Sequence, residues 1–367
     1  MGRRKPSLQA LSLFTGAGGM DVGIANAGFE NVWANDFDPK ACETYELNHS
    51  NPIKCGDIRD FAGDLANHAE IDLVHGGPPC QGFSVAGKMD PSDPRSELVW
   101  EFVEAVKIIR PRAFVCENVA ALGKLEKWRP IRSEIIKRLS KVGYQTEFIV
   151  LTASEYGVPQ KRQRVFFIGS REIDAPFDLR ALFSKVQETA PTVREVFKDL
   201  GRPGSERNQG LCNAKITIAQ SPVMRKSPYA GMLFNGLGRP LNPDDFASTM
   251  HASMGGNKTP FVDEEQLYND GPSWVEEYHK SLTDGGDPLP LDAAPSRLRR
   301  ITISEARAIQ TFPEEYQFAG RPSAQFRQIG NAVPCKLAEA VGKVAIRVLK
   351  RKLPERMAEE SGQLQLI

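Results

Sequence analysis

The sequence lacks long apolar runs, and its few cysteines are widely spaced. No apolar run is long enough to span a bilayer, which argues against a membrane-spanning helix. Six cysteines in 367 residues, none in a Cys-x-x-Cys pair, argue against both a disulfide framework and a zinc knuckle. No small-residue cleavage site follows the basic N-terminus, so we expect no signal peptide. We therefore expect a cytoplasmic protein without a bound metal, in a reducing compartment where a working thiol persists.

The net charge alone does not indicate a partner, because 47 basic and 46 acidic residues leave the chain at +1. The charges are segregated along the sequence, however. Residues 201–240 carry six basic residues and one acidic residue, whereas residues 241–290 carry two basic and ten acidic residues. A locally basic face can therefore exist on a near-neutral protein. A solvated surface is the alternative to a phosphate-binding face.

Short apolar runs alternate with helical patterns through the first half of the chain. The predicted strands are residues 8–14, 32–34, 71–75, 113–116, 146–151 and 165–168. The predicted helices between and after them are residues 20–27, 39–48, 97–109, 131–139, 303–309 and 336–349. This alternation predicts an α/β fold with a mostly parallel sheet that helices cover on both faces.

The composition changes after about residue 171. Residues 200–295 are rich in Gly, Pro, Asn and Ser and have few helix signals, which predicts a smaller, loop-rich domain. We divide the chain into four segments on this basis. They are a large domain (1–190), a small domain (191–297), a hinge segment (298–325) and a C-terminal segment that packs back on the large domain (326–367).

Glycines and acidic residues follow the first two of these strands and a further short predicted strand that ends before Gly56. Phe14-Thr15-Gly16-Ala17-Gly18-Gly19 allows a sharp turn and close approach of a ligand. Asp36 could accept hydrogen bonds from ribose hydroxyls, Phe37 could pack on an adenine, and Asp57 could accept from an adenine amine. A helix cap or a surface charge explains each acid alone, but three at successive strand ends favour a nucleoside site. Asp21 replaces the third glycine of a Gly-x-Gly-x-x-Gly pattern, which disfavours a nicotinamide cofactor.

A loop cysteine lies between rigid prolines and a glycine, in Gly77-Pro78-Pro79-Cys80-Gln81-Gly82-Phe83-Ser84. Buried structural cysteines usually lie within strands or helices, as the sequence predicts for Cys116. A loop at the carboxyl end of a strand is where a nucleophile would be presented. We therefore single out Cys80 and interpret the remaining cysteines as structural, namely Cys42, Cys55, Cys212 and Cys335.

Two further motifs place charged side chains near strand ends. A carboxyl at Glu117, in Glu117-Asn118-Val119, could be held partly protonated by burial and share a proton, although a helix N-cap at Asn118 is the alternative. Arg162 and Arg164 stand two apart in a predicted extended segment, which suits binding of carbonyl or phosphate oxygens. An Arg-x-Arg pair alone is a weak signal. Gln328 to Pro334 predicts a turn into the final helix.

Taken in this order, the motifs resemble those of the DNA (cytosine-5)-methyltransferase family of bacterial and phage modification enzymes. The resemblance covers residues 8–170 and about 297–350. It rests on Phe-x-Gly-x-Gly-Gly, Pro-Pro-Cys-Gln, Glu-Asn-Val, Gln-x-Arg-x-Arg-Val and Gln-x-Gly-Asn-Ala-Val-Pro. It implies a Rossmann-like domain that uses S-adenosylmethionine, and a target-recognition domain over residues 191–297. The implied substrate is a cytosine in a specific short duplex DNA sequence, methylated at carbon 5.

The resemblance also implies a role for each matching residue. Cys80 would add to carbon 6 of a flipped-out cytosine, Glu117 would bind ring nitrogen 3 and the exocyclic amine, and Arg164 would hold the ring carbonyl with support from Arg162. The implied cofactor site comprises Phe14, Gly16, Gly18, Gly19, Asp36, Phe37, Asp57, Ile58, Pro79, Asn331 and Val333. The implied DNA contacts are Gln81, Ser84, Lys88 and Arg95 in the loop after the cysteine, with Thr249 and Lys258 in the small domain.

Alternatives remain open at this point. An RNA cytosine-5 methyltransferase would use the same catalytic set, but members acting on transfer RNA carry Cys-Phe-Thr, and no cysteine here precedes Phe. A paralogue that only binds would be expected to lack Cys80 or Glu117. Residues 249–258 could equally form a structural turn. The expected partners are duplex DNA and, functionally, a cognate restriction endonuclease, and we expect a monomer in the bacterial cytoplasm.

Overall fold

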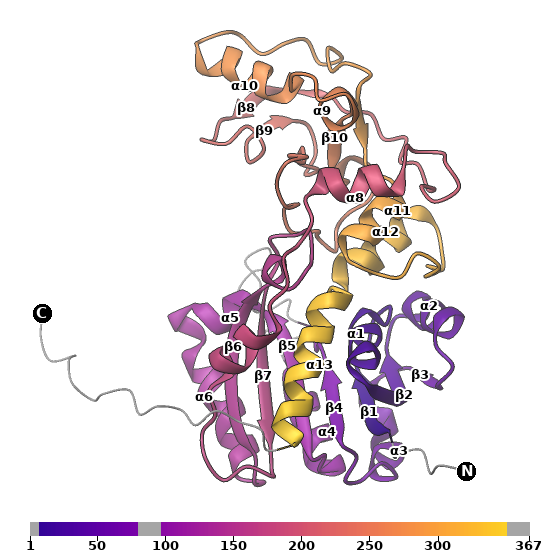
Figure 1. Ribbon diagram of the computed structural model, residues 1–367, viewed down its shortest axis with the longest axis vertical. Coiled ribbons are helices and arrows are strands. Elements are labelled where there is room, and N and C mark those ends of the chain that lie inside the picture. Colours follow the sequence, from indigo (N-terminus) through magenta and orange to yellow (C-terminus); the bar gives the residue numbers. More distant parts are fainter. Residues whose placement is uncertain (1–6, 80–96, 351–367) are drawn as a thin grey trace, which may run out of the picture.

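The computed structural model describes residues 7–79 and 97–350, and within them seven strands form one sheet covered by helices on both faces (Figure 1). The strand order is β3-β2-β1-β4-β5-β7-β6. All neighbouring pairs from β3 to β5 are parallel, whereas β7 is antiparallel to both β5 and β6. The bounds are β1 (Leu8–Leu13), β2 (Phe29–Asp36), β3 (Ile53–Cys55), β4 (Leu73–Gly76), β5 (Ala113–Val119), β6 (Gln145–Thr152) and β7 (Gln163–Ser170). The predicted α/β fold is confirmed.

Alternation along the buried strands divides the apolar side chains between two core layers. Ala113 and Val115 of β5 belong to one layer, whereas Phe114 and Cys116 belong to the other. Successive side chains of a strand point to opposite faces, so a strand buried on both faces is apolar throughout. The helices that cover the sheet are α1 (Gly19–Ala27), α2 (Pro39–Asn48), α3 (Ala62–Ala66), α4 (Leu98–Ile109), α5 (Ala120–Lys124), α6 (Arg129–Ser140), α7 (Leu179–Phe183) and α13 (Cys335–Leu349).

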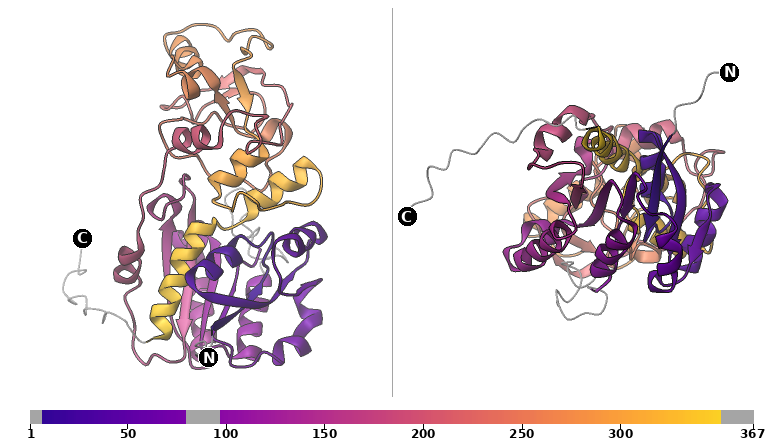
Figure 2. Two further views of the ribbon diagram at one scale, coloured as in Figure 1. Left: turned by 45° about the vertical axis from the view of Figure 1, so that its right-hand side comes forward. Right: turned by 90° about the horizontal axis from the view of Figure 1, so that it is seen from below.

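The last helix returns to the first. In Figures 1 and 2, α13 lies along the sheet beside α1. Small residues allow this close approach, because a Cβ atom on Gly23 would lie 2.3 Å from the carbonyl oxygen of Cys335. A Cβ atom on Gly342 would likewise lie 2.6 Å from the Cβ atom of Ala27. The end of the chain therefore forms part of the core that the N-terminal residues begin.

Gly23→Ala should destabilise the protein by about 1–3 kcal/mol, because the added methyl group cannot fit without separating α1 from α13. Gly63→Ala is the matched control, since a Cβ atom there would meet no heavy atom within 4 Å. Denaturant titration of both variants measures the difference in the free energy of unfolding. Equal stability of the two variants would contradict the proposed packing.

A small lobe, which we define as residues 193–331, lies beyond one end of the sheet (Figure 1). It contains two two-stranded sheets and short helices around its own apolar clusters. Residues 298–309, from the predicted hinge segment, contribute to this core through β11 and α11. The bounds are α8 (Val193–Leu200), β8 (Ile218–Val223), β9 (Met232–Phe234), β10 (Phe261–Asp263), α9 (Glu264–Tyr268), α10 (Trp274–Thr283), β11 (Leu298–Arg300), α11 (Ile303–Ile309) and α12 (Pro322–Asn331).

No helix within the described ranges has the length and apolar character needed to cross a membrane.

Candidate active site

The glycine loop after β1 is held by a buried carboxylate. Phe14, Gly16 and Gly18 all have positive φ, at 53°, 57° and 77°. Asp21, fully buried on α1, accepts hydrogen bonds from the Thr15 hydroxyl and from Tyr45 at 2.9 Å. The sequence had indicated Asp21 only as a departure from a dinucleotide pattern. Its structural role is to fix the loop in its left-handed conformation.

Asp36, at the carboxyl end of β2, faces the same loop. One carboxylate oxygen accepts from the Gly16 amide at 2.7 Å, and the other accepts from the Asp38 amide at 2.8 Å. Burial raises the pKa of Asp36 despite these amide donors. A Cβ atom on Gly16 would meet no described atom within 4 Å, so the loop borders open space here. Gly16 and Asp36 therefore lie together beside open space at the carboxyl ends of β1 and β2.

Phe37 and Asp57 are two further residues of the predicted cofactor site. The Phe37 side chain is 73% exposed, which leaves a ring face available for stacking. Asp57 caps the 3₁₀ helix Ile58–Phe61 and accepts from the Arg59 guanidinium at 2.5 Å. The same pair holds the pKa of Asp57 below its ordinary value. The helix-cap interpretation of Asp57 is therefore present in the structure, and Ile58 is buried beneath it.

A carboxylate and a guanidinium meet where β5 ends and β7 begins. Val119 is paired with Arg164 in the strand register, and Arg164 Nε lies 2.7 Å from Glu117 Oε1. Both side chains are largely buried, at 15% and 11% exposure. A Cβ atom on Gly77 would lie 2.9 Å from Glu117 Oε2, which places the end of β4 against this pair. The ion pair and the turn after β4 therefore lie together at the carboxyl ends of β4 and β5.

The Gly-Pro-Pro turn is fixed against β5. Asn118 Nδ2 donates to the Pro78 carbonyl oxygen at 3.2 Å, and the Asn118 side chain also accepts from the Val119 amide. Pro79 is the last residue described on this side of the turn. The predicted residues that follow it lie outside the described residues, namely Cys80, Gln81, Ser84, Lys88 and Arg95.

Arg162 has different surroundings from Arg164. Its guanidinium is 1% exposed and donates to the carbonyl oxygens of Met250 at 2.9 Å, Gly330 at 3.1 Å and Asn331 at 3.4 Å. Charge-assisted donation to backbone carbonyls fixes position strongly when water is excluded. Arg162 therefore joins the segment before β7 to the small lobe, at Met250 and at the last two residues of α12.

A pair of buried glutamines reinforces this junction. Gln160 Nε2 donates to Gln310 Oε1 at 2.8 Å, and the Met250 amide donates to Gln160 Oε1 at 2.9 Å. Gln310 in turn donates to the carbonyl oxygens of Ile329 and Ala332. Sequence reasoning gave Gln160 no role of its own. The only signal was its place in a polar motif before a predicted strand.

The remaining predicted residues come from the second half of the chain. Val333 is buried, and its carbonyl oxygen would lie 2.7 Å from a Cβ atom on Gly19, so the turn before α13 contacts the glycine loop. Asn331 is exposed, Thr249 is half-buried and Lys258 is exposed. The structure therefore brings β1, β4, β5, β7 and the turn before α13 together at one edge of the sheet.

Comparisons with known proteins agree with this arrangement. A family model described as C-5 cytosine-specific DNA methylase matches residues 8–347. Type II methyltransferase M1.HphI of Haemophilus parahaemolyticus is 30% identical and covers 93% of this chain and 87% of its own. Type II methyltransferase M.DdeI of Desulfomicrobium norvegicum is 33% identical over 91% of this chain and 87% of its own.

Solved structures show the same fold. A putative DNA modification methyltransferase from an Escherichia coli prophage has a TM-score of 0.64 and 24% identity, over 94% of this chain and all of its own. Dnmt2 of S. pombe has a TM-score of 0.65 and 19% identity, over 94% of this chain and 99% of its own.

Proposed function

Because the chain belongs to the C-5 cytosine-specific DNA methylase family, we propose that it methylates carbon 5 of a flipped-out cytosine within a specific short duplex sequence. It is a DNA (cytosine-5)-methyltransferase of the Type II modification kind. The observation that carries the finer proposal is the Glu117–Arg164 pair beside the turn that leads into Cys80. Residues 191–297 would form the target-recognition domain.

S-adenosylmethionine is the proposed methyl donor, and its sulfonium would supply an electrophilic methyl group. A Cβ atom added at Gly16 would meet no heavy atom within 4 Å, so the glycine loop and Asp36 lie beside open space. We propose that the nucleoside part of the donor binds there. The exposed ring of Phe37 could stack on adenine. Asp57, Ile58 and Pro79 would complete the site from the sheet edge, with Asn331 and Val333 from the other end of the chain.

Phe37→Ala should raise the Kd for S-adenosylmethionine roughly tenfold, because the stacking surface for the adenine is lost. Isothermal titration calorimetry measures this directly. Leu47→Ala is the control, since Leu47 is another exposed apolar side chain, on neighbouring α2, and no cofactor role is proposed for it. Unchanged affinity of the Phe37 variant would remove this residue from the proposed site.

The proposed chemistry begins with the Cys80 thiolate. As its sulfur bonds to carbon 6, electrons would move towards ring nitrogen 3 and the ring carbonyl, and nitrogen 3 would take up a proton from water. That N–H and the exocyclic amine would donate to Glu117, while Arg164 donates to the carbonyl oxygen. Carbon 5 would then take the methyl group of S-adenosylmethionine, with S-adenosylhomocysteine as the leaving group. Loss of the carbon 5 proton to a base or water would let the carbon–sulfur bond break, which would release the Cys80 thiolate, and nitrogen 3 would give up its proton.

The target cytosine must leave the duplex to reach this edge of the sheet. Extrusion costs a few kcal/mol in lost stacking and pairing, which contacts in the complex must offset. The proposed Type II role would protect this sequence from a cognate restriction endonuclease. We further propose that the enzyme acts as a monomer in the bacterial cytoplasm.

Transfer of tritiated methyl groups distinguishes DNA from RNA as the substrate. We expect the wild-type protein to label duplex DNA and to leave transfer RNA unlabelled. Labelling of transfer RNA alone would contradict the proposed substrate, and labelling of neither would contradict the proposed activity.

A further inference from the structure

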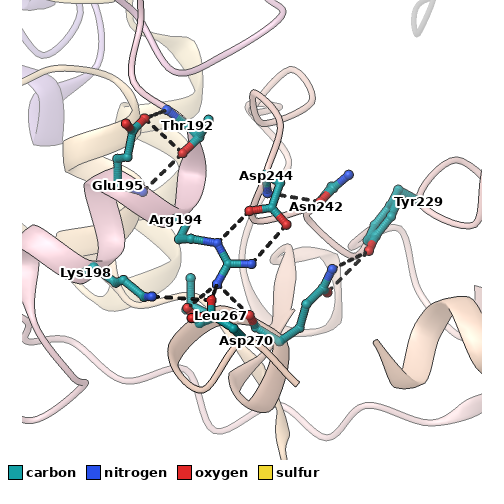
Figure 3. A network of polar contacts seen from close by, with 10 residues as sticks. Thr192, Arg194, Glu195, Lys198, Tyr229, Asn242, Asp244, Leu267 and Asp270 are labelled. Atoms are coloured by element: carbon teal, nitrogen blue, oxygen red, sulfur yellow. Dashed lines mark hydrogen bonds and ion pairs between the residues drawn. The ribbon is translucent and has the colours of Figure 1, made fainter. Parts of the chain in front are cut away.

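Two cysteines of the large domain form a cluster that can react as well as pack. Cys42 lies on α2, and Cys55 is the last residue of β3. By contrast, the cluster around Arg194 of α8, which donates to Asp244 and Asp270, holds the small lobe together and contains no thiol (Figure 3). We call Cys42 and Cys55 the thiol pair.

The two cysteines converge on one backbone atom. The Asp36 carbonyl oxygen accepts from the Cys42 thiol at 3.5 Å and from the Gly56 amide at 2.9 Å. Gly56 directly follows Cys55, and Cys55 is itself the register partner of Asp36 across β2 and β3. Burial and then the neighbouring Cys55 thiol raise the pKa of Cys42, so the two sulfurs also act on each other. The thiols are therefore neighbours at the carboxyl ends of these strands.

The two thiols differ in their access to solvent. Cys55 is exposed, whereas Cys42 is 4% exposed. A dissolved oxidant therefore reaches the Cys55 sulfur first, and the Cys42 thiol stands behind it as a resolving group. An accessible cysteine beside a resolving cysteine is the usual arrangement of a redox-sensing site. Both cysteines are free thiols in the structure, which is the reduced form of such a pair.

The thiol pair adjoins the residues proposed to bind the nucleoside part of the cofactor. Asp36 and Phe37 stand just before α2, which carries Cys42, and Asp57 stands two residues after Cys55. A covalent bond between two sulfurs is much shorter than a nonbonded contact between them, so α2 or the end of β3 must shift to form it. Such a shift displaces the side chains that would hold the ribose and the adenine.

We propose that the thiol pair is an oxidation site, at which a peroxide forms a disulfide between Cys42 and Cys55, and that this bond weakens the binding of S-adenosylmethionine. The inference rests on the proposed cofactor site and adds a regulation of it. The disulfide would be reversible, because an exposed sulfur such as that of Cys55 is open to attack by a reducing thiol.

The oxidation proceeds in two steps. The Cys55 thiolate attacks one peroxide oxygen, the oxygen–oxygen bond breaks, and the departing hydroxide takes up a proton to give water. The Cys42 sulfur then bonds to the sulfur of the Cys55 sulfenic acid, the sulfur–oxygen bond breaks, and the hydroxide leaves with the Cys42 proton as a second water. Two thiols are oxidised to one disulfide, and one peroxide is reduced to two waters.

The test uses Cys80→Ser protein, so that oxidation of the proposed nucleophile cannot contribute. After treatment with hydrogen peroxide, peptide mapping by mass spectrometry should find the Cys42 and Cys55 peptides joined, two hydrogens lighter than their sum. Isothermal titration calorimetry should then give a Kd for S-adenosylmethionine at least about tenfold above that of the reduced protein, because the site residues are displaced. Dithiothreitol should reverse both changes.

Three further variants in the Cys80→Ser background serve as controls. Cys42→Ser and Cys55→Ser should each bind S-adenosylmethionine as the reduced parent does, and peroxide should leave their Kd unchanged. Cys212→Ser is the matched control, because Cys212 is a half-buried cysteine of the small lobe, and this protein should stay as sensitive to peroxide as the parent.

Three results would overturn the inference. They are the absence of the joined peptides, a disulfide that leaves the Kd unchanged, and an equal response to peroxide when either member of the thiol pair is replaced. If the fully reduced protein binds no S-adenosylmethionine, the proposed cofactor site fails, and the inference fails with it.

Discussion

We expect Cys80→Ser to lower the rate of methyl transfer to duplex DNA by at least about a thousandfold. A serine hydroxyl is scarcely ionised at neutral pH and adds poorly to carbon 6. A free thiol, with a pKa of about 8.5, already supplies some thiolate, and the site need only increase that fraction. Tritiated-methyl transfer under single-turnover conditions measures the chemical step.

Two controls separate lost chemistry from lost structure. Cys80→Ser should bind S-adenosylmethionine and duplex DNA within about twofold of the wild type, since the thiol is assigned no binding role. Cys55→Ser replaces an exposed cysteine and should retain full activity. A Cys80→Ser enzyme with a rate within tenfold of the wild type would mean that the thiol is not the nucleophile.

Glu117→Gln should lower kcat/KM about 10²- to 10⁴-fold, because a neutral amide cannot accept the nitrogen 3 proton as a carboxylate does. The change also breaks the ion pair that holds Arg164 at 2.7 Å, so both groups that would orient the cytosine are affected. Steady-state kinetics on one duplex substrate measures the loss.

The comparison variant is Glu126→Gln. The Glu126 side chain is 75% exposed, and no catalytic or binding role is proposed for it. Its activity should equal that of the wild type. The Kd for S-adenosylmethionine should be unchanged in Glu117→Gln, which would show that the cofactor site is intact. If Glu117→Gln retains more than a third of the wild-type kcat/KM, the carboxylate is not required for the reaction.

Much of the fold could be predicted from periodicity, but strand direction could not. Residues 146–151 and 165–168 were predicted as closing strands, and β6 and β7 occupy them. β7 runs antiparallel between β5 and β6. The sequence pattern cannot predict this direction, because an apolar run looks the same whichever way the strand runs, and only tertiary packing determines it. The sequence prediction gives no helix at α10, because the segment around it is rich in glycine and proline. A helix-start signal is nevertheless present, since Ser273, which caps α10, stands three residues before Glu276.

The positions of the site residues could be predicted where they follow strands. Parallel strands end at one edge of a sheet, so Gly16, Asp36 and Glu117 come together there. The supporting contacts could not be predicted in this way. Asp21 beneath the glycine loop and Gln160 against Gln310 meet partners that lie far away in the sequence or on another element. Such contacts depend on packing between elements, which local patterns do not encode.

The central claim is that the Cys80 sulfur becomes covalently joined to carbon 6 of the target cytosine. Duplexes that carry 5-fluorocytosine at the target position test it, because the fluorine on carbon 5 cannot leave as a proton does and the adduct persists. With S-adenosylmethionine present, we predict a denaturation-resistant complex with the mass of protein, DNA and one methyl group, and none with Cys80→Ser. Absence of any adduct, while unmodified duplexes continue to be methylated, would contradict the account.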